Sequence, residues 1–572
     1  MKKSSDLFAA AILSIFLVAS SFGQPSTVSK SASKFAKKNS VTTKANEVVT
    51  IERIEKDFSE ALTLIQDNHY SGKRLEYNDL FKASIVSMLH TLDPHSSYFD
   101  SKEFEEFRSN QNSRYYGIGA TINDLRDPSG KVIATFIKAT FKGAPANRAG
   151  LRYGDKIVEV NGKPMLGKPY PVVRDELRGP RGTVAKLVVE RYGTGKRENI
   201  EIIRDAVSTP SISDAYMFRP GIGYISMTGG FNRTTYDEFR RAMRKLKARG
   251  MQHVILDLRE NGGGLVNQAY YVANTFLESG QTIFTQKGRQ RRSARSFAAD
   301  NPNPDNTPIV VMVNGSTASA SEIVAGALQD HDRALIVGEN TFGKGLVQNP
   351  YMLKYGSMLL LTIAKYETPS GRLIQRDYSD GNLYNYYTNG GTLDEKNKPK
   401  KRKGAEKLTD SGRVVYSGGG IAPDIYAKMP TISNQRYRIR EKLSDPIFSF
   451  ALNVAFRKVK GLERLTVDRA IVFDYDLKNN DFAIDESVYK AFKEYVIKNY
   501  KISAAKIDRE KEFVKRSLRG ELVTAAYGSQ TAFRVHREYD SQLKRATVAM
   551  PEARRLFMQR QKSAKNRRNE QD

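Results

Sequence analysis

The segment IVVMVNGSTASASEIVAGALQDHDRALIVGENTFGKG, residues 309–345, contains the pattern that decides the fold. An apolar run at 309–313 predicts a buried strand, residues 319–329 predict a helix, and a second apolar run at 334–337 predicts another buried strand. This order favours a right-handed crossover in a largely parallel sheet. Because the alternation extends over residues 206–375, we expect a βαβ-rich core.

The rest of the chain divides into regions with different apolar spacing. Residues 48–92 have helical spacing, residues 113–205 have short strands and turns, and residues from 439 onward are helical again. The expected fold is multidomain α/β, with an inserted β domain in the core and helical N- and C-terminal regions. The expected regions are a signal peptide at 1–23, a disordered linker at 24–46, an N-terminal helical region at 47–112, the β domain at 113–205, the core at 206–435 with a loop insertion at 376–412, a C-terminal helical region at 436–550 and a basic tail at 551–572.

Composition narrows the chemistry before any motif is considered. The 572 residues include 40% apolar and 27% charged side chains, which is typical of a globular chain that is too long for a single core. Cysteine is absent, so disulfides, thiol nucleophiles and thiolate metal sites are excluded. The net charge of +29 would attract anionic lipid, acidic proteins or nucleic acid, and it does not choose among them.

The N-terminus has the pattern of an export signal. Met1-Lys2-Lys3 is positively charged, an apolar run extends from Leu7 to Phe22, and Ser21 and Gly23 place small residues ahead of a cleavage position before Gln24. The run is shorter than the roughly 20 residues of a membrane span, which favours cleavage over an uncleaved anchor. We therefore expect the mature protein in the periplasm or outside the cell, soluble or peripherally attached to a membrane, and without a nucleic-acid partner.

A serine-rich segment, Gly315 to Ile323, connects the strand at 309–313 to the following helix. At such a corner a hydroxyl can be exposed beside backbone N–H groups and the positive end of the helix dipole. Ser319 and Glu322 also have the spacing of a helix capping box, so the segment alone is equally consistent with a structural role.

Two further features favour catalysis. Lys344 lies between two glycines after a buried strand, and burial without a carboxylate would lower its pKa from about 10.4 and let it act as a neutral general base. Gln348 could hydrogen-bond that amine and orient it. The turn Asp257 to Gly264 could present N–H groups to an oxyanion, although a plain strand-to-helix turn or an anion-binding nest would have the same sequence.

Two other kinds of site are disfavoured. Residues 338–344 match the first seven positions of a phosphate-binding P-loop, but Gly345 stands where Ser or Thr would bind Mg²⁺. None of the six histidines has a position that suits a Ser-His-Asp triad.

Nine short motifs follow one another along the chain, and their order is more specific than any one of them. They are Thr91–Tyr98, Gly143–Leu151, Gly154-Asp155, Asn161-Gly162, Leu177–Pro180, Asp257–Gly264, the serine cluster, Phe342–Gly345 and Gly420–Asp424. With these motifs in this order, the chain resembles, over about residues 48–460, the C-terminal processing peptidases, serine peptidase family S41.

The resemblance implies a fold, an activity and a set of site residues. The core would be a crotonase- or ClpP-like peptidase, residues 113–205 would be a PDZ domain, and no metal or organic cofactor would be needed. Arg178 would lie in a segment that couples the position of the PDZ domain to the active site. The implied roles are nucleophile for Ser319, base for Lys344, lysine-orienting group for Gln348, oxyanion N–H donors for Ala320 and Gly263, and a carboxylate-binding loop for Tyr116, Gly117, Ile118 and Gly119.

The expected function is therefore that of an exported endopeptidase that binds the free C-termini of protein or peptide substrates. A non-catalytic PDZ scaffold of the cell envelope is the alternative. The basic residues of Lys396–Lys407 and the tail could attach the protein to anionic membranes, but solvated charge is the favoured interpretation. The helical flanks are compatible with a homo-oligomer and with an adaptor or activating partner.

Overall fold

The computed structural model of the chain describes residues 50–569 except 75, 389–403 and 468. The predicted signal peptide and linker, together with residues 396–403 of the basic run, lie outside the described residues. The chain forms two compact units, Met1–Ser101 with Asn349–Thr362 and Lys102–Gln348 with Ile363–Asp572. Among the described residues, no helix is both long enough and apolar enough to cross a membrane.

The first unit contains two long helices, a short 3-10 helix and a strand pair. Helices α1 (Ile51–Asn68) and α2 (Tyr77–His90) flank the 3-10 turn η1 (Gly72–Arg74), and β1 (Ser97–Phe99) pairs antiparallel with the first half of β18 (Met358–Glu367). The Asp93 carboxylate accepts the backbone N–H of Ser96 at 2.8 Å and its hydroxyl at 2.6 Å, which ends the helical segment in a tight turn.

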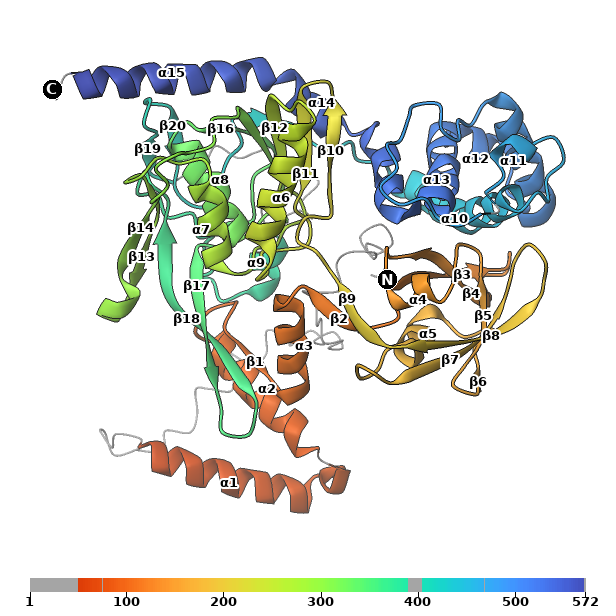
Figure 1. Cartoon of the computed structure of the whole chain (residues 1–572). Coiled ribbons are helices and arrows are strands. Elements are labelled where there is room, and N and C mark those ends of the chain that lie inside the picture. The colour runs from red at the N-terminus through yellow and green to blue at the C-terminus, as the bar shows by residue number, and fades with distance from the viewer. Residues whose placement is uncertain (1–49, 75, 389–403, 468, 570–572) are drawn as a thin grey trace. The chain divides into compact units, whose positions relative to one another are not determined.

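A six-stranded sheet forms the centre of the second unit, and it confirms the predicted βαβ core (Figure 1). The strand order is β10-β11-β12-β15-β16-β21, in which β10 is antiparallel and all the others are parallel. All five residues of β15 and of β16 are buried, as expected for parallel strands with helices on both faces. The strands are β10 (Asp214–Arg219), β11 (Ile222–Ser226), β12 (His253–Asp257), β15 (Ile309–Val313), β16 (Ala334–Gly338) and β21 (Ile425–Tyr426).

Helices from distant parts of the sequence cover the two faces of this sheet. One face packs on α6 (Thr235–Ala248), α7 (Val266–Asn274) and α8 (Ala320–Asp330), and the other packs on α14 (Ser541–Val548) and α15 (Met550–Asn569). The segment predicted as a basic tail is therefore largely helical. Met550, Ala553 and Phe557 recur at helical spacing, and their burial fixes the first half of α15 to the core.

Shorter elements surround this sheet. The second half of β18 pairs with β13 (Thr282–Gly288), which also pairs with β14 (Arg295–Ala298), and β17 (Leu346–Met352) precedes β18. The predicted loop insertion contains α9 (Leu383–Thr388) and part of the hairpin of β19 (Glu406–Leu408) and β20 (Val414–Tyr416). The 3-10 turns η2 (Arg291–Ser293) and η3 (Glu463–Leu465) lie in loops.

The β domain has its own sheet and core. Its strand order is β3-β4-β5-β7-β8, with β6 on β5, so that β3 is an edge strand, and β2 pairs with β9 in a separate ribbon. The elements are α3 (Ser101–Gln111), which precedes the domain, and β2 (Arg114–Gly117), β3 (Ala120–Arg126), β4 (Val132–Thr140), α4 (Pro145–Arg148), β5 (Lys156–Val160), β6 (Lys163–Pro164), α5 (Tyr170–Leu177), β7 (Val184–Glu190), β8 (Arg197–Ile203) and β9 (Asp205–Ser208).

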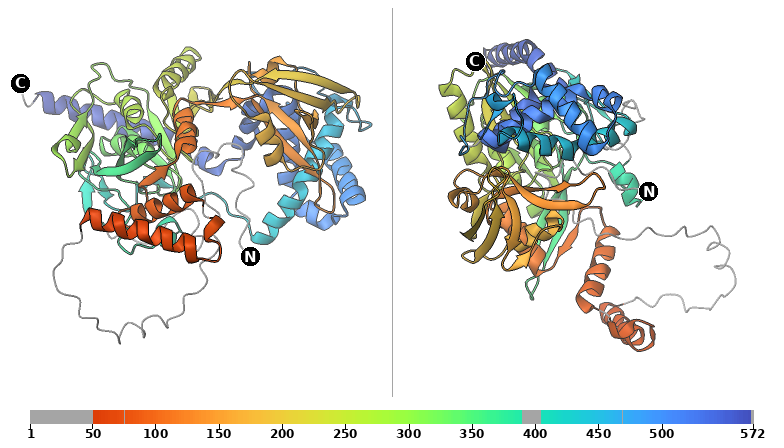
Figure 2. Two further views of the ribbon diagram at one scale, coloured as in Figure 1. Left: turned by 90° about the horizontal axis from the view of Figure 1, so that it is seen from below. Right: turned by 90° about the vertical axis from the view of Figure 1, so that its right-hand side faces the viewer.

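The C-terminal helical region packs against this β domain, as both views of Figure 2 show. It consists of α10 (Asn434–Ala455), α11 (Glu486–Tyr500), α12 (Ala504–Arg509) and α13 (Lys511–Arg537). Phe448 of α10 is 2% exposed and makes edge contacts with Phe136 and Tyr153 of the β domain, each with ring centres 5.8 Å apart. The Lys138 ammonium lies 4.2 Å from the Phe448 ring centre and also pairs with Glu521 of α13. One apolar cluster therefore joins both parts.

Replacing Phe448 by alanine is expected to lower the free energy of unfolding by about 3–5 kcal/mol, because it leaves a cavity between the β domain and α10. Thermal unfolding followed by far-UV circular dichroism measures the loss. Ile497→Ala on α11, where the side chain is 41% exposed, is the matched control and should change stability by less than about 1 kcal/mol. Equal effects of the two substitutions would contradict this account of the interface.

Candidate active site

The serine corner between β15 and α8 has a strained backbone. Ser319 is the N-cap of α8 and has φ 56° and ψ −116°, in the left-handed region that only glycine adopts readily. Two hydrogen bonds hold it there, from the Ser319 N–H to Glu322 Oε2 at 2.9 Å and from the buried Tyr366 hydroxyl to the Ser319 carbonyl at 3.1 Å. Such conformations persist only where the surrounding structure enforces them. Ser319 itself is half-buried.

The carboxylate of Glu322 joins this corner to the segment that carries Lys344. It is fully buried, and its Oε2 accepts the backbone N–H of both Ser319, at 2.9 Å, and Lys344, at 2.8 Å. Its Oε1 accepts the Gly343 N–H at 2.7 Å and the Thr341 hydroxyl at 2.5 Å. Burial raises the pKa of Glu322, and these four donors oppose that rise by stabilising the ionised form.

Lys344 lies in a turn that requires a glycine, Gly343, immediately before it. The Lys344 side chain is half-buried, and its Nζ donates to Gln348 Oε1 at 2.8 Å. Gly343 has φ 88°, and a Cβ there would lie 2.8 Å from the Gly420 nitrogen. The close approach of these backbones explains why glycine precedes the lysine, since any side chain would displace the turn.

The glycine turn after β12 packs directly on the serine corner. A Cβ on Gly263 would lie 2.8 Å from Ser319 Cβ and 2.9 Å from the Ala320 nitrogen. The Asn261 carbonyl accepts the Ala318 N–H at 3.0 Å, and this hydrogen bond joins the glycine turn to the serine corner. The Gly263 N–H donates to Asn261 Oδ1 at 3.0 Å, so this N–H already has an acceptor within the turn. Ala320 is the first residue of α8, where N–H groups have no partner inside the helix.

Five of the site residues predicted from the sequence therefore lie on three segments that meet. Glu322 fixes the backbones of Ser319 and Lys344, Gly263 packs on Ser319 and Ala320, and Gln348 contacts Lys344.

The other predicted residues form a loop of the β domain. Tyr116 and Gly117 end β2, and Ile118 and Gly119 lead into the edge strand β3, which lies against α5. The Ile118 carbonyl accepts the Ala146 N–H at 2.7 Å, and a Cβ on Gly119 would lie 2.4 Å from Ala144 Cβ. The loop thus rests on α4 and presents an edge strand next to a helix.

Sequence reasoning recognised Glu322 only as part of a capping box, and it missed Tyr366 and Thr341. The capping interaction is real, but the same carboxylate also holds Lys344, and no local spacing indicates that second contact. Tyr366 belongs to no motif, and Thr341 stands at a variable position of the disfavoured P-loop match. Within the part of the chain that the structure describes, no group of three or more His, Asp or Glu side chains could hold a metal ion.

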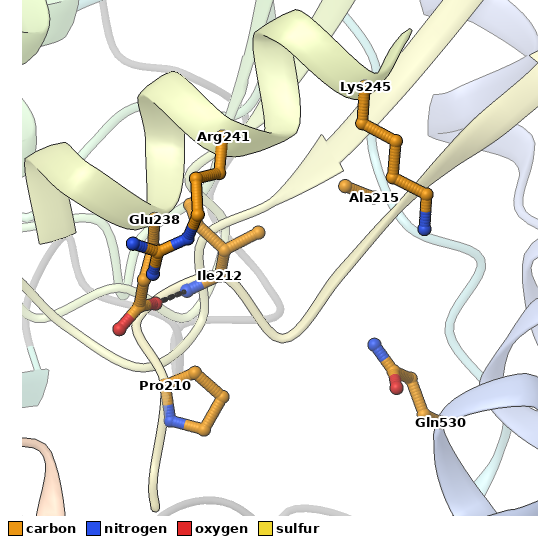
Figure 3. A pocket seen from close by; sticks show the side chains of 7 residues that line it. All are labelled: Pro210, Ile212, Ala215, Glu238, Arg241, Lys245 and Gln530. Atoms are coloured by element: carbon orange, nitrogen blue, oxygen red, sulfur yellow. Dashed lines mark hydrogen bonds between the residues drawn. The ribbon is translucent and has the colours of Figure 1, made fainter. Parts of the chain in front are cut away.

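A cavity of about 190 Å³ lies away from these residues, where β10 and α6 approach α13 (Figure 3). Glu238 in its wall accepts the Ile212 N–H at 2.9 Å, and Gln530 donates to the Ser213 carbonyl at 2.9 Å. Both polar side chains are therefore hydrogen-bonded to the backbone of the segment before β10. The cavity is lined by Pro210, Ile212, Ala215, Glu238, Arg241, Lys245 and Gln530.

The fold and this constellation define a peptidase core with an attached β domain, and the comparisons agree. Residues 221–381 match the model of peptidase family S41, and residues 136–191 match a PDZ domain model. A carboxy-terminal-processing protease of Bartonella bacilliformis is 36% identical over 300 residues, which cover 52% of this chain and 67% of that protein. A probable CtpA-like serine protease of Staphylococcus aureus is 32% identical over 313 residues, which cover 54% of this chain and 60% of that protein.

Solved structures are also similar in sequence. The photosystem II D1 C-terminal processing protease is 26% identical, covers 66% of this chain and 94% of its own, and has a TM-score of 0.33. The PDZ domain of a carboxy-terminal protease from Vibrio cholerae, solved in complex with a peptide, is 29% identical, covers 16% of this chain and 97% of its own, and has a TM-score of 0.15.

The chain belongs to peptidase family S41, in the branch of the carboxy-terminal processing proteases that carry a PDZ domain. The predicted family, fold class and enzyme class, a serine-type peptidase, are thereby confirmed.

Glu322→Gln is expected to lower kcat by about 10- to 100-fold, because the new amide would point N–H groups at donors that need an acceptor and would displace Ser319 or Lys344. Steady-state cleavage of an unfolded polypeptide measures the effect. Glu510→Gln is the matched control, since Glu510 is equally buried but binds Arg436 and Arg440 in the helical region. A kcat for Glu322→Gln similar to that of Glu510→Gln would show that Glu322 does not position the site.

Proposed function

We propose that this protein is an exported serine endopeptidase that recognises the C-terminal tails of its substrates and cleaves them with a Ser319/Lys344 dyad. The observation that carries the proposal is the shared carboxylate oxygen, Glu322 Oε2, which accepts the backbone N–H groups of both residues. Two residues 25 positions apart in sequence are thereby held on one buried anchor. The hydrogen bond from Lys344 Nζ to Gln348 supports a fixed orientation of the amine.

In the proposed reaction, neutral Lys344 takes the proton of the Ser319 hydroxyl while the oxygen attacks the scissile carbonyl carbon. Backbone N–H groups at Ala320 and in the glycine turn stabilise the oxyanion of the tetrahedral intermediate. The Lys344 ammonium then protonates the leaving amine as the peptide C–N bond breaks, which leaves an ester on Ser319. Lys344 next deprotonates a water molecule, whose attack on the ester carbon breaks the bond to the serine oxygen. The Lys344 ammonium returns its proton to that oxygen, which releases the acid and restores both the Ser319 hydroxyl and the neutral amine.

The PDZ domain would select the substrate. Its strand β3 lies at an edge of the sheet, and an extended peptide can add to such an edge while its terminal carboxylate is held by the loop of Tyr116 to Gly119. We further propose that residues 1–23 direct export to the periplasm or the exterior and are removed there.

Incubation of the purified protein with an unfolded polypeptide that has an apolar free C-terminus tests this function. Ser319→Ala and Lys344→Ala should each lower kcat by at least about 1,000-fold, because either change removes a group that forms or breaks bonds. The same polypeptide with an amidated C-terminus should be cleaved with a kcat/KM about tenfold lower, since the proposed carboxylate contact is lost.

Cleavage by Ser319→Ala at the wild-type rate would refute the assignment of the nucleophile. Equal cleavage of free and amidated ends would refute tail recognition and leave the dyad intact. The non-catalytic scaffold predicts binding without any cleavage by the wild-type protein.

A further inference from the structure

The start of the glycine turn is held by an arginine with partners far away in sequence. Arg259 follows β12 by two residues, and its side chain is 13% exposed. Its Nε and Nη2 donate to the carboxylate of Asp257 at 2.9 and 2.7 Å. The same guanidinium donates from Nη2 to Asp540 Oδ2 at 2.6 Å and from Nη1 to Gln542 Oε1 at 2.7 Å. Its planar fork thus binds three side chains at once.

Asp540 and Gln542 belong to the junction between α13 and α14, 281 and 283 residues from Arg259. Asp540 is also the N-cap of α14, because its Oδ1 accepts the Leu543 N–H at 3.0 Å. Gln542 is fully buried and donates to the Ala427 carbonyl at 2.6 Å. Both side chains that bind Arg259 therefore make a second hydrogen bond to backbone elsewhere, which restricts where their oxygens can lie.

The end of α13 anchors this junction to the core sheet. Arg534 and Arg537 both pair with the buried Asp214 at the start of β10, with distances of 3.0 and 2.6 Å. The Arg537 guanidinium also lies 4.8 Å from the ring centre of Tyr224 on β11. The C-terminal segment 534–542 is thus joined to β10 by buried ion pairs and to β11 through the Tyr224 ring.

The backbone that follows Arg259 needs such support. Glu260 has φ 60°, Gly263 has φ 96° and Gly264 has φ 140°, so three of the five residues after Arg259 have positive φ. The Glu260 N–H donates to Asn314 Oδ1 at 3.1 Å on the serine side of the turn. Arg259 anchors the turn on the side away from Asn314. Glu260, a non-glycine residue with positive φ, would change its backbone conformation if these anchors were lost.

We propose that Asp540 is a positioning residue of the active site: by holding Arg259, it keeps the glycine turn in the conformation that packs Gly263 against Ser319. The C-terminal junction of α13 and α14 is on this account part of the peptidase site, although it lies outside the matched peptidase segment. The inference rests on the proposed function insofar as the turn serves catalysis at Ser319. The clamp itself is a structural relation that can be tested without activity.

Asp540→Asn tests the proposal, because asparagine still caps α14 but removes the charged partner of Arg259. We expect kcat to fall about tenfold while KM stays within twofold, since the turn acts on the transition state rather than on binding. The matched control is Asp485→Asn. Asp485 also caps a helix, α11, and also pairs with an arginine, Arg464, but it lies in the helical region. This control should keep kcat within twofold of the wild type.

A double-mutant cycle separates the clamp from general destabilisation. Arg259→Lys keeps a positive charge but loses the planar fork, so it should lower kcat by a similar factor, and adding Asp540→Asn to it should cause no further loss. Fully additive losses would overturn the proposal, as would a kcat for Asp540→Asn within twofold of the Asp485→Asn control.

Hydrogen exchange provides a readout that does not depend on cleavage. In the Ser319→Ala background, amides of residues 258–264 should exchange about tenfold faster in Asp540→Asn than in Asp485→Asn, while the amides of the β domain exchange equally. Equal exchange in the two variants would overturn the clamp. If Ser319→Ala proved fully active, the proposed function would fail, and the exchange comparison would still decide whether Asp540 holds the turn.

Discussion

A buried carboxylate with four donors is the interaction on which the rest of this site depends. Glu322 is fully buried, and each of its oxygens accepts two hydrogen bonds from the segments that carry Ser319 and Lys344. Removing a charge from water is costly unless its hydrogen bonds are replaced. Here the replacements are three backbone N–H groups and the Thr341 hydroxyl, so the free-energy cost of burying the carboxylate depends on the positions of the segments that carry Ser319 and Lys344.

The same constraint explains the strain and the glycines around it. Ser319 adopts a left-handed conformation at the start of α8 because Glu322 and Tyr366 hold its N–H and carbonyl. Gly263 and Gly343 are needed where two backbones come within van der Waals contact, since a Cβ at either position would lie less than 3 Å from a neighbouring atom. Strain at the serine and close approach at the glycines are thus two consequences of bringing three loops to one point.

The C-terminal helices take part in both functional regions. Through Phe448 and Glu521 they pack on the PDZ domain, and through Asp540 they reach the arginine at the glycine turn. Helix α13 carries Glu521 near its middle and Arg537 at its end, with a kink at Gly528 between them. A region that the sequence marks only as helical therefore touches the parts of the protein for which binding and catalysis are proposed.

The sequence by itself determined the strand–helix–strand order of the core and the β domain between helical flanks, because each leaves a local pattern of apolar spacing. The candidate roles of Ser319, Lys344 and the glycine turn came from the family resemblance that the order of the motifs carries. The sequence did not reveal the second contact of Glu322, the hydrogen bond from Tyr366, the packing of the first half of α15 on the core or the contact of Asp540 with Arg259. These were decided only by the tertiary structure, since a hydrogen bond between residues tens or hundreds of positions apart leaves no periodic trace along the chain. The sheet and its crossovers bring such residues together, and in the folded chain the capping residue Glu322 therefore also binds the backbone of Lys344.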